Sequence, residues 1–271
     1  MRVPRDDDPP DVERRPRRQE RFEHIIGLLS DGREVTVAEL VEELSVSSAS
    51  VRRDLEQLEQ RRLLVRTHGG AIGAPSVSYE LPLRYRSSAR VEQKRAIARE
   101  AVSRVRGERA IVGLTGGTTT TEVARVLGAE GEITIVTNAL NIASEVVVRP
   151  AVKLVMTGGV ARGRSYELCG PLAERTLGEV HLDVAFVGVD GLSAGAGLTT
   201  HDEVEANTNR VLIQRASTVV VVADSAKLGR AAFASICGVD AVDEVITDDG
   251  ADEDEVEALR EAGVTVTAVP V

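Results

Sequence analysis

The stretch from Ser47 to Ala71, SSASVRRDLEQLEQRRLLVRTHGGA, constrains the fold more than any other part of the chain. Ser47 or Ser48 can accept hydrogen bonds from the free amides of a new helix, in which the apolar residues Val51, Leu55 and Leu58 recur at i, i+4 and i+7. One face of this helix is therefore expected to pack inward. The opposite face carries side chains that hydrogen-bond phosphates and base edges, namely Ser48, Ser50, Arg52, Arg53 and Gln57.

The flanking residues predict a winged helix-turn-helix. Thr36 can cap a helix that precedes the recognition stretch, and Ser45-Val46 is short enough to form the turn between the two helices. The expected elements are helices over 18–29 and 37–44, a helix that begins at Ser47 or Ser48 and stops at Arg61-Arg62, a strand over 63–67 and a glycine turn at 69–70. Three helices and a wing need only about 55 to 60 residues, which is enough for a small core.

The run ELVEELSVSSASVRRDLEQLEQRRLLVRTHGGA resembles the DNA-binding signature of the DeoR family of transcriptional regulators, above all in VRRDLEQLE followed by RTHGGA. The resemblance implies a regulator whose partner is double-stranded operator DNA. The residues expected to contact DNA are Ser48, Ser50, Arg52 and Arg53 on the helix and Arg66, Thr67 and His68 in the wing. Neighbouring helical residues point about 100° apart, so one of the two adjacent arginines is expected to face phosphate rather than a base.

Composition narrows the class of protein. A length of 271 residues predicts two domains, and 42% hydrophobic residues suffice for a sizeable core although only 2% are aromatic. No uncharged apolar run is as long as a membrane span and MRVPRDDDPP contains no signal core, so a cytoplasmic protein is expected. Cys169 and Cys237 are interpreted as small buried hydrophobes. The four histidines lack ligand spacing, so neither a metal nor a cofactor is expected.

The net charge of −10 is unevenly distributed. Residues 1–75 hold 13 Arg/Lys and 15 Asp/Glu, while the remainder holds 20 and 28. The recognition stretch from Ser47 to Gly70 carries five Arg against three acidic residues. The acidic bulk is expected to repel DNA and to leave the N-terminal part as the only approach face.

The rest of the chain alternates short apolar runs with helical segments. Strands are expected over 110–114, 133–137, 152–156, 184–189, 218–223, 244–247 and 264–269, and helices over 84–106, 119–127, 140–148, 172–177, 203–216 and 252–262. This alternation predicts parallel strands joined by crossover helices. The expected fold class is α/β, with an N-terminal winged helix-turn-helix domain followed by an open, mostly parallel α/β sensor domain. We expect a disordered tail (1–17), the helix-turn-helix domain (18–74), a linker (75–90) and the sensor domain (91–271).

One strand end has a distinctive sequence, TGGTTTT over residues 115–121, which runs from a strand straight into a helix. Glycines let the backbone approach a ligand, a helix N-terminus offers unpaired amides, and threonine hydroxyls add donors. The pattern is neither a Walker loop nor a dinucleotide fingerprint. Because ligands of such sheets bind beyond the carboxyl ends of the strands, we interpret this turn as a phosphate site.

This part of the chain resembles the C-terminal half of DeoR regulators, which is similar in fold to ribose-5-phosphate isomerase and binds phosphorylated sugars. The resemblance implies that Thr115, Gly116, Gly117, Thr118 and Thr119 hold the phosphate of an effector, and that Asn138, Gly159, Asp190 and Lys227 line its sugar. Many family members place an aspartate where this chain has Thr115. The implied function is a homo-oligomeric DNA-binding transcriptional regulator, a repressor of carbohydrate metabolism genes, whose operator binding is modulated by a phosphorylated sugar.

Two alternatives come from other classes. A sugar-phosphate isomerase that carries a DNA-binding module would need a general base and an acid, which Asp190, Glu203, Glu205 or Lys227 could supply. The isomerase resemblance calls for a second carboxylate close behind Asp190, where this chain has Leu192-Ser193, so no enzyme is expected. An oligomeric scaffold that only binds a metabolite would show no salt-sensitive DNA binding.

Overall fold

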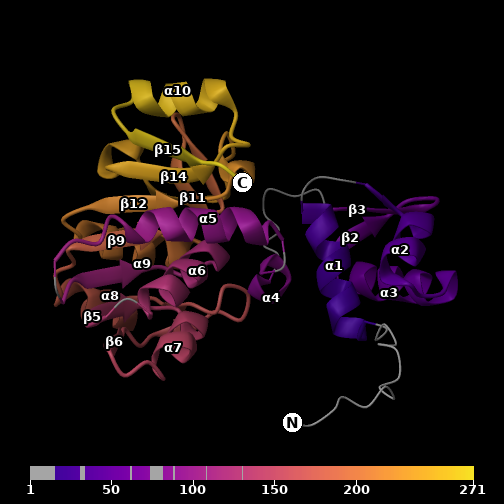
Figure 1. Ribbon diagram of the computed structural model, residues 1–271, viewed down its shortest axis with the longest axis horizontal. Coiled ribbons are helices and arrows are strands. Elements are labelled where there is room, and N and C mark those ends of the chain that lie inside the picture. Colours follow the sequence, from indigo (N-terminus) through magenta and orange to yellow (C-terminus); the bar gives the residue numbers. More distant parts are fainter. Residues whose placement is uncertain are drawn as a thin grey trace, which may run out of the picture. The chain divides into compact units, whose positions relative to one another are not determined.

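The computed structural model of the protein describes residues 16–30, 34–61, 63–73, 82–87, 89–107, 109–129 and 131–271. The chain forms two compact units, residues 1–74 and 75–271 (Figure 1). The expected disordered tail lies outside the described residues apart from residues 16 and 17, and so do residues 75–81 of the expected linker.

The first unit is a three-helix winged domain, as predicted. Its elements are α1 (Arg18–Ser30), β1 (Val35–Thr36), α2 (Val37–Leu44), α3 (Ser48–Gln60), β2 (Leu64–Arg66) and β3 (Gly70–Gly73). Thr36 caps α2 through a capping box, and Ser47 caps α3. Strand β1 was not predicted, because two residues are too few to show a periodic pattern. It pairs with β3 at Gly70, where a Cβ atom would lie 1.8 Å from the Val35 carbonyl oxygen.

The second unit is built on a parallel sheet of seven strands. In chain order these are β4 (Ile111–Leu114), β5 (Ile133–Thr137), β6 (Val152–Met156), β9 (Val184–Val187), β12 (Val219–Val222), β14 (Glu244–Asp248) and β15 (Thr265–Val269). Their order across the sheet is β15-β14-β12-β9-β4-β5-β6, and every neighbouring pair is parallel. Figure 1 labels all of these strands except β4. The prediction of a mostly parallel α/β domain is confirmed.

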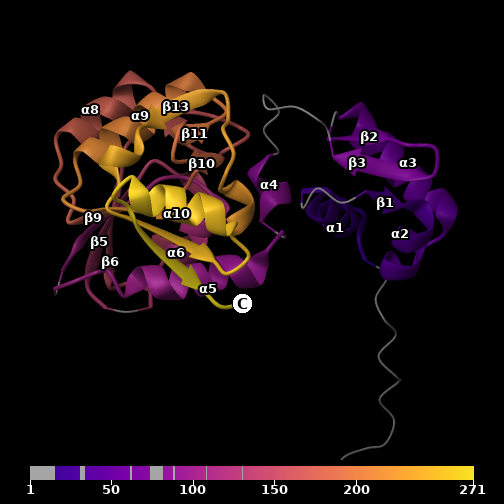
Figure 2. The ribbon, with the colours of Figure 1, turned by 90° about the horizontal axis from the view of Figure 1, so that it is seen from above.

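Helices cover both faces of this sheet (Figure 2). One face packs against α5 (Val91–Val102), α6 (Thr118–Leu127) and α7 (Leu140–Val146). The other face packs against α8 (Pro171–Gly178), α9 (Glu203–Gln214), α10 (Glu253–Glu261) and a small sheet of β10 (Gly191–Ser193), β11 (Gly197–Thr200) and β13 (Ala234–Cys237). The valines of β12 alternate between the two cores: Val219 and Val221 face one, Val220 and Val222 the other.

The single helix predicted over 84–106 is wrong. The chain forms a short helix α4 (Leu83–Arg86), turns, and begins α5 at Val91. Arg90 has a left-handed backbone, with φ of 50°, which ends helical continuity at that residue. The hairpin of β7 (Val160–Ala161) and β8 (Leu168–Cys169) and the small sheet were not predicted either, because their strands are short. Within the described residues no helix is long and apolar enough to cross a membrane.

Candidate functional sites

Helix α3 presents the predicted recognition surface on the first unit. The Ser47 hydroxyl accepts the Ser50 N–H at 3.3 Å, and the two hydroxyl oxygens lie 3.0 Å apart, so Ser50 takes part in the helix start. Ser48, Arg52 and Arg53 are exposed. Neither arginine forms a hydrogen bond or an ion pair with the part of the chain that the structure describes. Their guanidinium groups are therefore available to an anionic partner.

The wing places Arg66 and His68 on the surface and Thr67 partly inside it. The Thr67 N–H donates to the Gly70 carbonyl at 3.0 Å, closing the turn between β2 and β3. The Arg66 N–H donates to Glu59 Oε1 at 3.2 Å, which fixes the wing against α3. The predicted wing residues thus share one unit with α3, with the Arg66 and His68 side chains exposed.

Sequence reasoning missed the structural role of Asp54. Its carboxylate is buried on the inner side of α3 and accepts hydrogen bonds from Arg21 Nε at 2.7 Å and Arg21 Nη2 at 3.2 Å, both from α1. Arg18 Nε lies 3.5 Å away. Only its position three residues after the inward-facing Val51 hinted at this orientation. Because Asp54 is neutralised inside the unit, the outer face of α3 is more cationic than the residue count suggests.

In the second unit, the glycine-threonine turn lies where the strand order reverses. Strands β4 and β9 are neighbours in the sheet, and crossovers leave from them in opposite directions, which is the usual position of a ligand crevice in such folds. The turn after β4 meets the turn after β9 closely, since the Gly188 N–H donates to Thr115 Oγ1 at 2.9 Å. Thr115 is fully buried in this joint, and its hydroxyl is occupied by the backbone.

Helix α6 begins directly after Gly117, whose φ of 132° few residues other than glycine adopt. The first turn contains no acidic residue, and no side chain caps it. The Thr120 and Thr121 hydroxyls donate to the Gly117 carbonyl at 3.1 and 2.5 Å, so these two threonines serve the helix start. Thr119 is buried and Thr118 is half-buried. The turn therefore offers first-turn amides and the Thr118 hydroxyl to an anion.

Glu167, from the β7–β8 hairpin, is the main residue of this region that sequence reasoning missed. Its Oε1 accepts the Gly116 N–H at 2.8 Å and the Asn138 side-chain amide at 3.2 Å. A Cβ atom on Gly116 would lie 2.4 Å from Glu167 Cγ, so this contact needs the glycine. A carboxyl group thus lies beside the turn although Thr115 replaces the aspartate that the resemblance implied. The buried Asn138 Oδ1 has no partner among the described residues.

Burial and the nearby carboxyl group of Glu205 raise the pKa of Glu167 well above its ordinary value. Glu205 is itself held by Arg162 and by Thr200, whose Oγ1 lies 2.6 Å from Glu205 Oε1. A raised pKa favours the protonated form of a carboxyl group, which can donate a hydrogen bond. The pair therefore favours a protonated carboxyl group next to the glycine-threonine turn.

Asp190 lies at the end of β9 and collects positive charge. Arg86 Nη1 is 2.8 Å and Lys227 Nζ 3.6 Å from its Oδ1, and His201 Nε2 is 4.0 Å from Oδ2. Burial alone would raise the pKa of Asp190, but these cations together hold it well below the ordinary range. Thr200 Oγ1, 3.0 Å from Asp190 Oδ2, connects this cluster to Glu205 and so to Glu167. The structure therefore brings Asp190 and Lys227 into one polar network with Gly116 and Asn138.

The backbone alone explains why residue 159 is a glycine. Its φ is 123°, and a Cβ atom would lie 2.9 Å from the Cys169 carbonyl oxygen across the hairpin.

The second residue that sequence reasoning left without a role is Lys94, which is only 4% exposed. It donates to the Arg86 carbonyl at 2.8 Å and to the Ala89 carbonyl, fixing the turn between α4 and α5. Burial lowers the pKa of Lys94 to about 8, although Asp224 opposes the shift.

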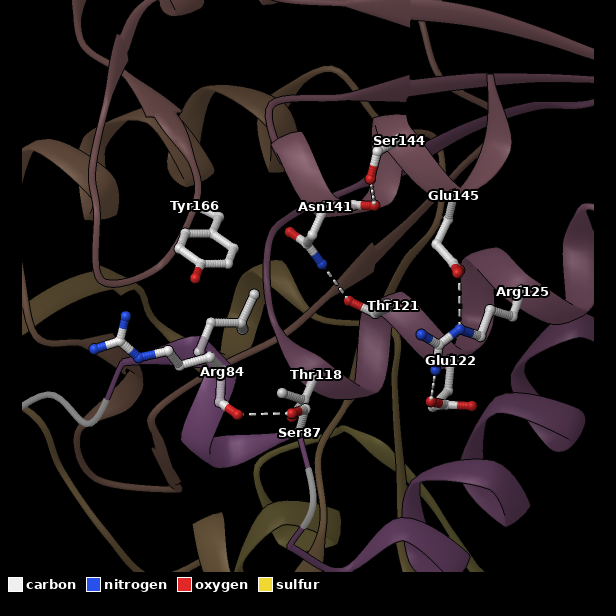
Figure 3. A pocket seen from close by; sticks show the side chains of 11 residues that line it. Arg84, Ser87, Thr118, Thr121, Glu122, Arg125, Asn141, Ser144, Glu145 and Tyr166 are labelled. Atoms are coloured by element: carbon white, nitrogen blue, oxygen red, sulfur yellow. Dashed lines mark hydrogen bonds and ion pairs between the residues drawn. The ribbon is translucent and has the colours of Figure 1, made fainter. Parts of the chain in front are cut away.

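A cavity of about 280 Å³ opens on the outer side of the turn (Figure 3). Thr118 and Thr121 of α6, Asn141 of α7, Leu83 of α4 and Tyr166 are among the residues that line it. No group of three or more potential metal ligands occurs among the residues the structure describes.

Taken together, the two units define a winged helix-turn-helix protein with an α/β ligand-sensing domain. A family model described as the DeoR-like helix-turn-helix domain matches residues 21–76, and one described as the DeoR C-terminal sensor domain matches residues 89–249. The chain belongs to the DeoR family of transcriptional regulators.

Relatives that are similar over most of the chain agree with this assignment. The chain is 39% identical to the HTH-type transcriptional regulator GlpR of Haloferax volcanii, over 91% of this chain and 96% of that protein. It is 36% identical to a putative aga operon transcriptional repressor of Escherichia coli O157:H7 (92% and 93%) and 33% identical to the glycerol-3-phosphate regulon repressor of Escherichia coli K12 (84% and 90%). Ribose 5-phosphate isomerase A of Methanocaldococcus jannaschii matches 51% of this chain and 55% of that one, at 20% identity and a TM-score of 0.39.

Proposed function

We propose that this protein is a repressor that binds operator DNA through α3 and the wing and whose binding is modulated by a phosphorylated sugar or polyol. The observation that carries the DNA part is the pair of exposed arginines on α3, which form no ion pair with the described chain. Relatives over most of the chain bear the names of an aga operon repressor and a glycerol-3-phosphate regulon repressor. A dimer would set two α3 helices about 34 Å apart on one operator.

The effector part rests on the glycine-threonine turn. We place the phosphate at the first-turn amides of α6, with Gly116, Gly117, Thr118 and Thr119 around it, because this turn has neither a side-chain cap nor an acidic residue. Thr115 supports the phosphate site by accepting the Gly188 N–H, and not by offering a free hydroxyl to the phosphate. Asn138, Gly159, Asp190 and Lys227 stay predicted sugar-side residues.

We infer that the site does not catalyse isomerisation. The Asp190 carboxylate is held by Arg86, Lys227 and Thr200, and so is a poor general base. Leu192, where the isomerase resemblance calls for a carboxylate, is a fully buried core residue of β10. Turnover of pentose or hexose phosphates by the pure protein, lost in Asp190→Asn, would contradict this inference.

A gel-shift titration on the promoter region of the protein's own gene tests the proposed function. Arg52→Ala and Arg53→Ala are each expected to weaken binding by about 1 to 3 kcal/mol. A lost phosphate contact also makes the dependence of log K on log salt shallower by about 0.9. Arg99→Ala, an exposed arginine of α5, is the matched control and should leave binding unchanged.

The same assay with glycerol 3-phosphate, ribose 5-phosphate, fructose 1-phosphate and glucose 6-phosphate tests the effector part. At least one of them is expected to release the DNA, through a coupling of about 1 to 3 kcal/mol. Thr118→Val is expected to reduce this release without changing DNA affinity in the absence of ligand. DNA binding that ignores every sugar phosphate would contradict the effector part alone.

A further inference from the structure

The cavity between α4, α6 and α7 contains an acceptor whose orientation the surrounding hydrogen bonds determine. The Thr121 hydroxyl donates to the Gly117 carbonyl at 2.5 Å, so its only hydrogen is in use. The oxygen of this hydroxyl then accepts from Asn141, at 2.7 Å from Nδ2. The Asn141 amide nitrogen therefore faces Thr121, and its carbonyl oxygen must face the other way, toward the cavity (Figure 3).

That carbonyl oxygen, Asn141 Oδ1, is buried and has no hydrogen-bond partner among the described residues. A buried acceptor left without a donor costs about 1 to 3 kcal/mol. Because Asn141 lines the cavity, a ligand hydroxyl bound there can satisfy this acceptor.

Tyr166 adds a second group to the same space. Its φ of 63° is unusual for a residue with a side chain. Two backbone hydrogen bonds hold it there, from its N–H to the Arg162 carbonyl and from the Leu140 N–H to its own carbonyl, each 2.9 Å long. The phenol hydroxyl points into the cavity (Figure 3) and has no partner in the described part of the chain. Backbone strain of this kind is common where a side chain is positioned for a ligand.

The two ends of the cavity differ in charge. At one end Arg125 is neutralised by Glu122 and by Glu145, whose Oε2 lies 3.0 Å from Arg125 Nε. At the other end lie the Thr118 hydroxyl, the first-turn amides of α6 and, at the rim, Arg84, which forms no ion pair with the described residues. The end of the cavity at the start of α6 therefore favours an anionic group. The space near Asn141 and Tyr166 favours neutral hydroxyls.

We propose that this cavity receives the hydroxyl-bearing carbon chain of the effector, with Asn141 and Tyr166 as the residues that recognise its hydroxyls. The inference rests on the proposed phosphate position at the start of α6. It places the carbon chain in this cavity instead of beside the predicted sugar-side residues, none of which lines the cavity. A volume of about 280 Å³ is at the small end of the range of about 300 to 1,000 Å³ for ligand pockets. It suits a short phosphorylated polyol or sugar rather than a nucleotide.

The cavity also connects the ligand to α4, the first helix of the second unit. Leu83 and Arg84 of α4 line it, together with Ser87, which directly follows this helix, and Thr118 of α6. A ligand bound in this cavity contacts both helices and can therefore change the position or mobility of α4. Effector-induced DNA release should therefore depend on the cavity residues as well as on the turn.

Calorimetric titration of the full-length protein with the four sugar phosphates named above, and with inorganic phosphate, tests the proposal. Tyr166→Phe removes a hydroxyl that makes no hydrogen bond with the described residues, so the variant is expected to fold with an unchanged melting temperature. It should bind the preferred sugar phosphate about three- to tenfold more weakly, and Asn141→Leu about tenfold or more. Both should bind inorganic phosphate as the wild type does, whereas Thr118→Val weakens both kinds of ligand.

The outcomes separate the two proposals. Unchanged sugar-phosphate affinity in Tyr166→Phe and Asn141→Leu, with a loss in Thr118→Val, would overturn the cavity assignment and leave the proposed function intact. The Asn141 acceptor would then be satisfied by water. Failure of the wild type to bind any of the four sugar phosphates would contradict the effector part of the proposed function itself.

Discussion

Arg86 Nη1 lies 2.8 Å from Asp190 Oδ1, which joins the first helix of the second unit to the carboxyl end of β9. The arginine is 18% exposed and the aspartate 6%, so the pair is largely shielded from water. Lys94 fixes the same turn from the other side by donating to the Arg86 carbonyl. The start of the second unit is thus held directly at the strand ends where the effector is proposed to bind.

Replacing Arg86 by Gln is expected to destabilise the second unit by about 2 kcal/mol at pH 7, because Asp190 keeps Lys227 but loses its nearest cation. The lowered pKa of Asp190 stabilises the folded state above the ordinary range of aspartate, and this contribution is lost as the pH falls. The difference in unfolding free energy between wild type and variant should therefore be larger at pH 7 than at pH 3. Urea unfolding followed by circular dichroism measures it, and an equal difference at both values would contradict the assigned ion pair.

Glu167→Gln tests the neutral acid beside the turn. The folded-state pKa of Glu167 is raised, so its contribution is fully present below the ordinary pKa of glutamate and is lost as the pH rises through the folded-state value. Glutamine keeps the shape and a donor but does not titrate. The variant should gain stability relative to the wild type as the pH rises from the ordinary pKa of glutamate toward the folded-state value, by at most about 1.4 kcal/mol per pH unit. Parallel stability curves for the two proteins would show that Glu167 is ionised in the folded state.

The winged unit could largely be predicted from the sequence because its signals are local. The Thr36 and Ser47 caps lie next to the helices they start, and Val51, Leu55 and Leu58 repeat within one helix. The parallel sheet was predictable for the same reason, since each strand is a short apolar run between helical segments. The phosphate turn was visible because its glycines and threonines are consecutive.

What could not be predicted depends on contacts between distant parts of the chain. Glu167 lies 51 residues after Gly116, in a hairpin whose strands have two residues each, and nothing in its own neighbourhood marks it. Arg86 is 104 residues from Asp190, and the turn that brings it there requires the left-handed Arg90. Asp54 lies within a cationic stretch, and its own neighbours in the sequence indicate only an exposed charge. Its burial depends on Arg21, which comes from α1.

The buried carboxylate of Asp54 leads to a prediction for the winged unit. Asp54→Ala leaves Arg21 without its partner and is expected to cost about 3 kcal/mol, as is usual when one member of a buried pair is removed. Faster hydrogen exchange of the α1 and α3 amides, together with weaker operator binding, would report the loss. Glu56→Ala, an exposed acid on the same helix, is the control. Equal exchange rates in the two variants would contradict a structural role for Asp54.

Lys94→Met tests whether the buried lysine loses its proton in an accessible pH range. Burial lowers the folded-state pKa of Lys94 to about 8, whereas the unfolded value is 10.5. Between these values the unfolded chain binds more protons, so the lysine's contribution to the free energy of unfolding rises with pH, by at most about 1.4 kcal/mol per unit. Methionine lacks this dependence, and it leaves the Arg86 and Ala89 carbonyls without a donor. The wild type should therefore exceed the variant in stability at pH 7.5 and by a wider margin at pH 9.5, measured by urea unfolding. A margin that stays constant or narrows over this range would show that Lys94 keeps an ordinary pKa in the folded protein.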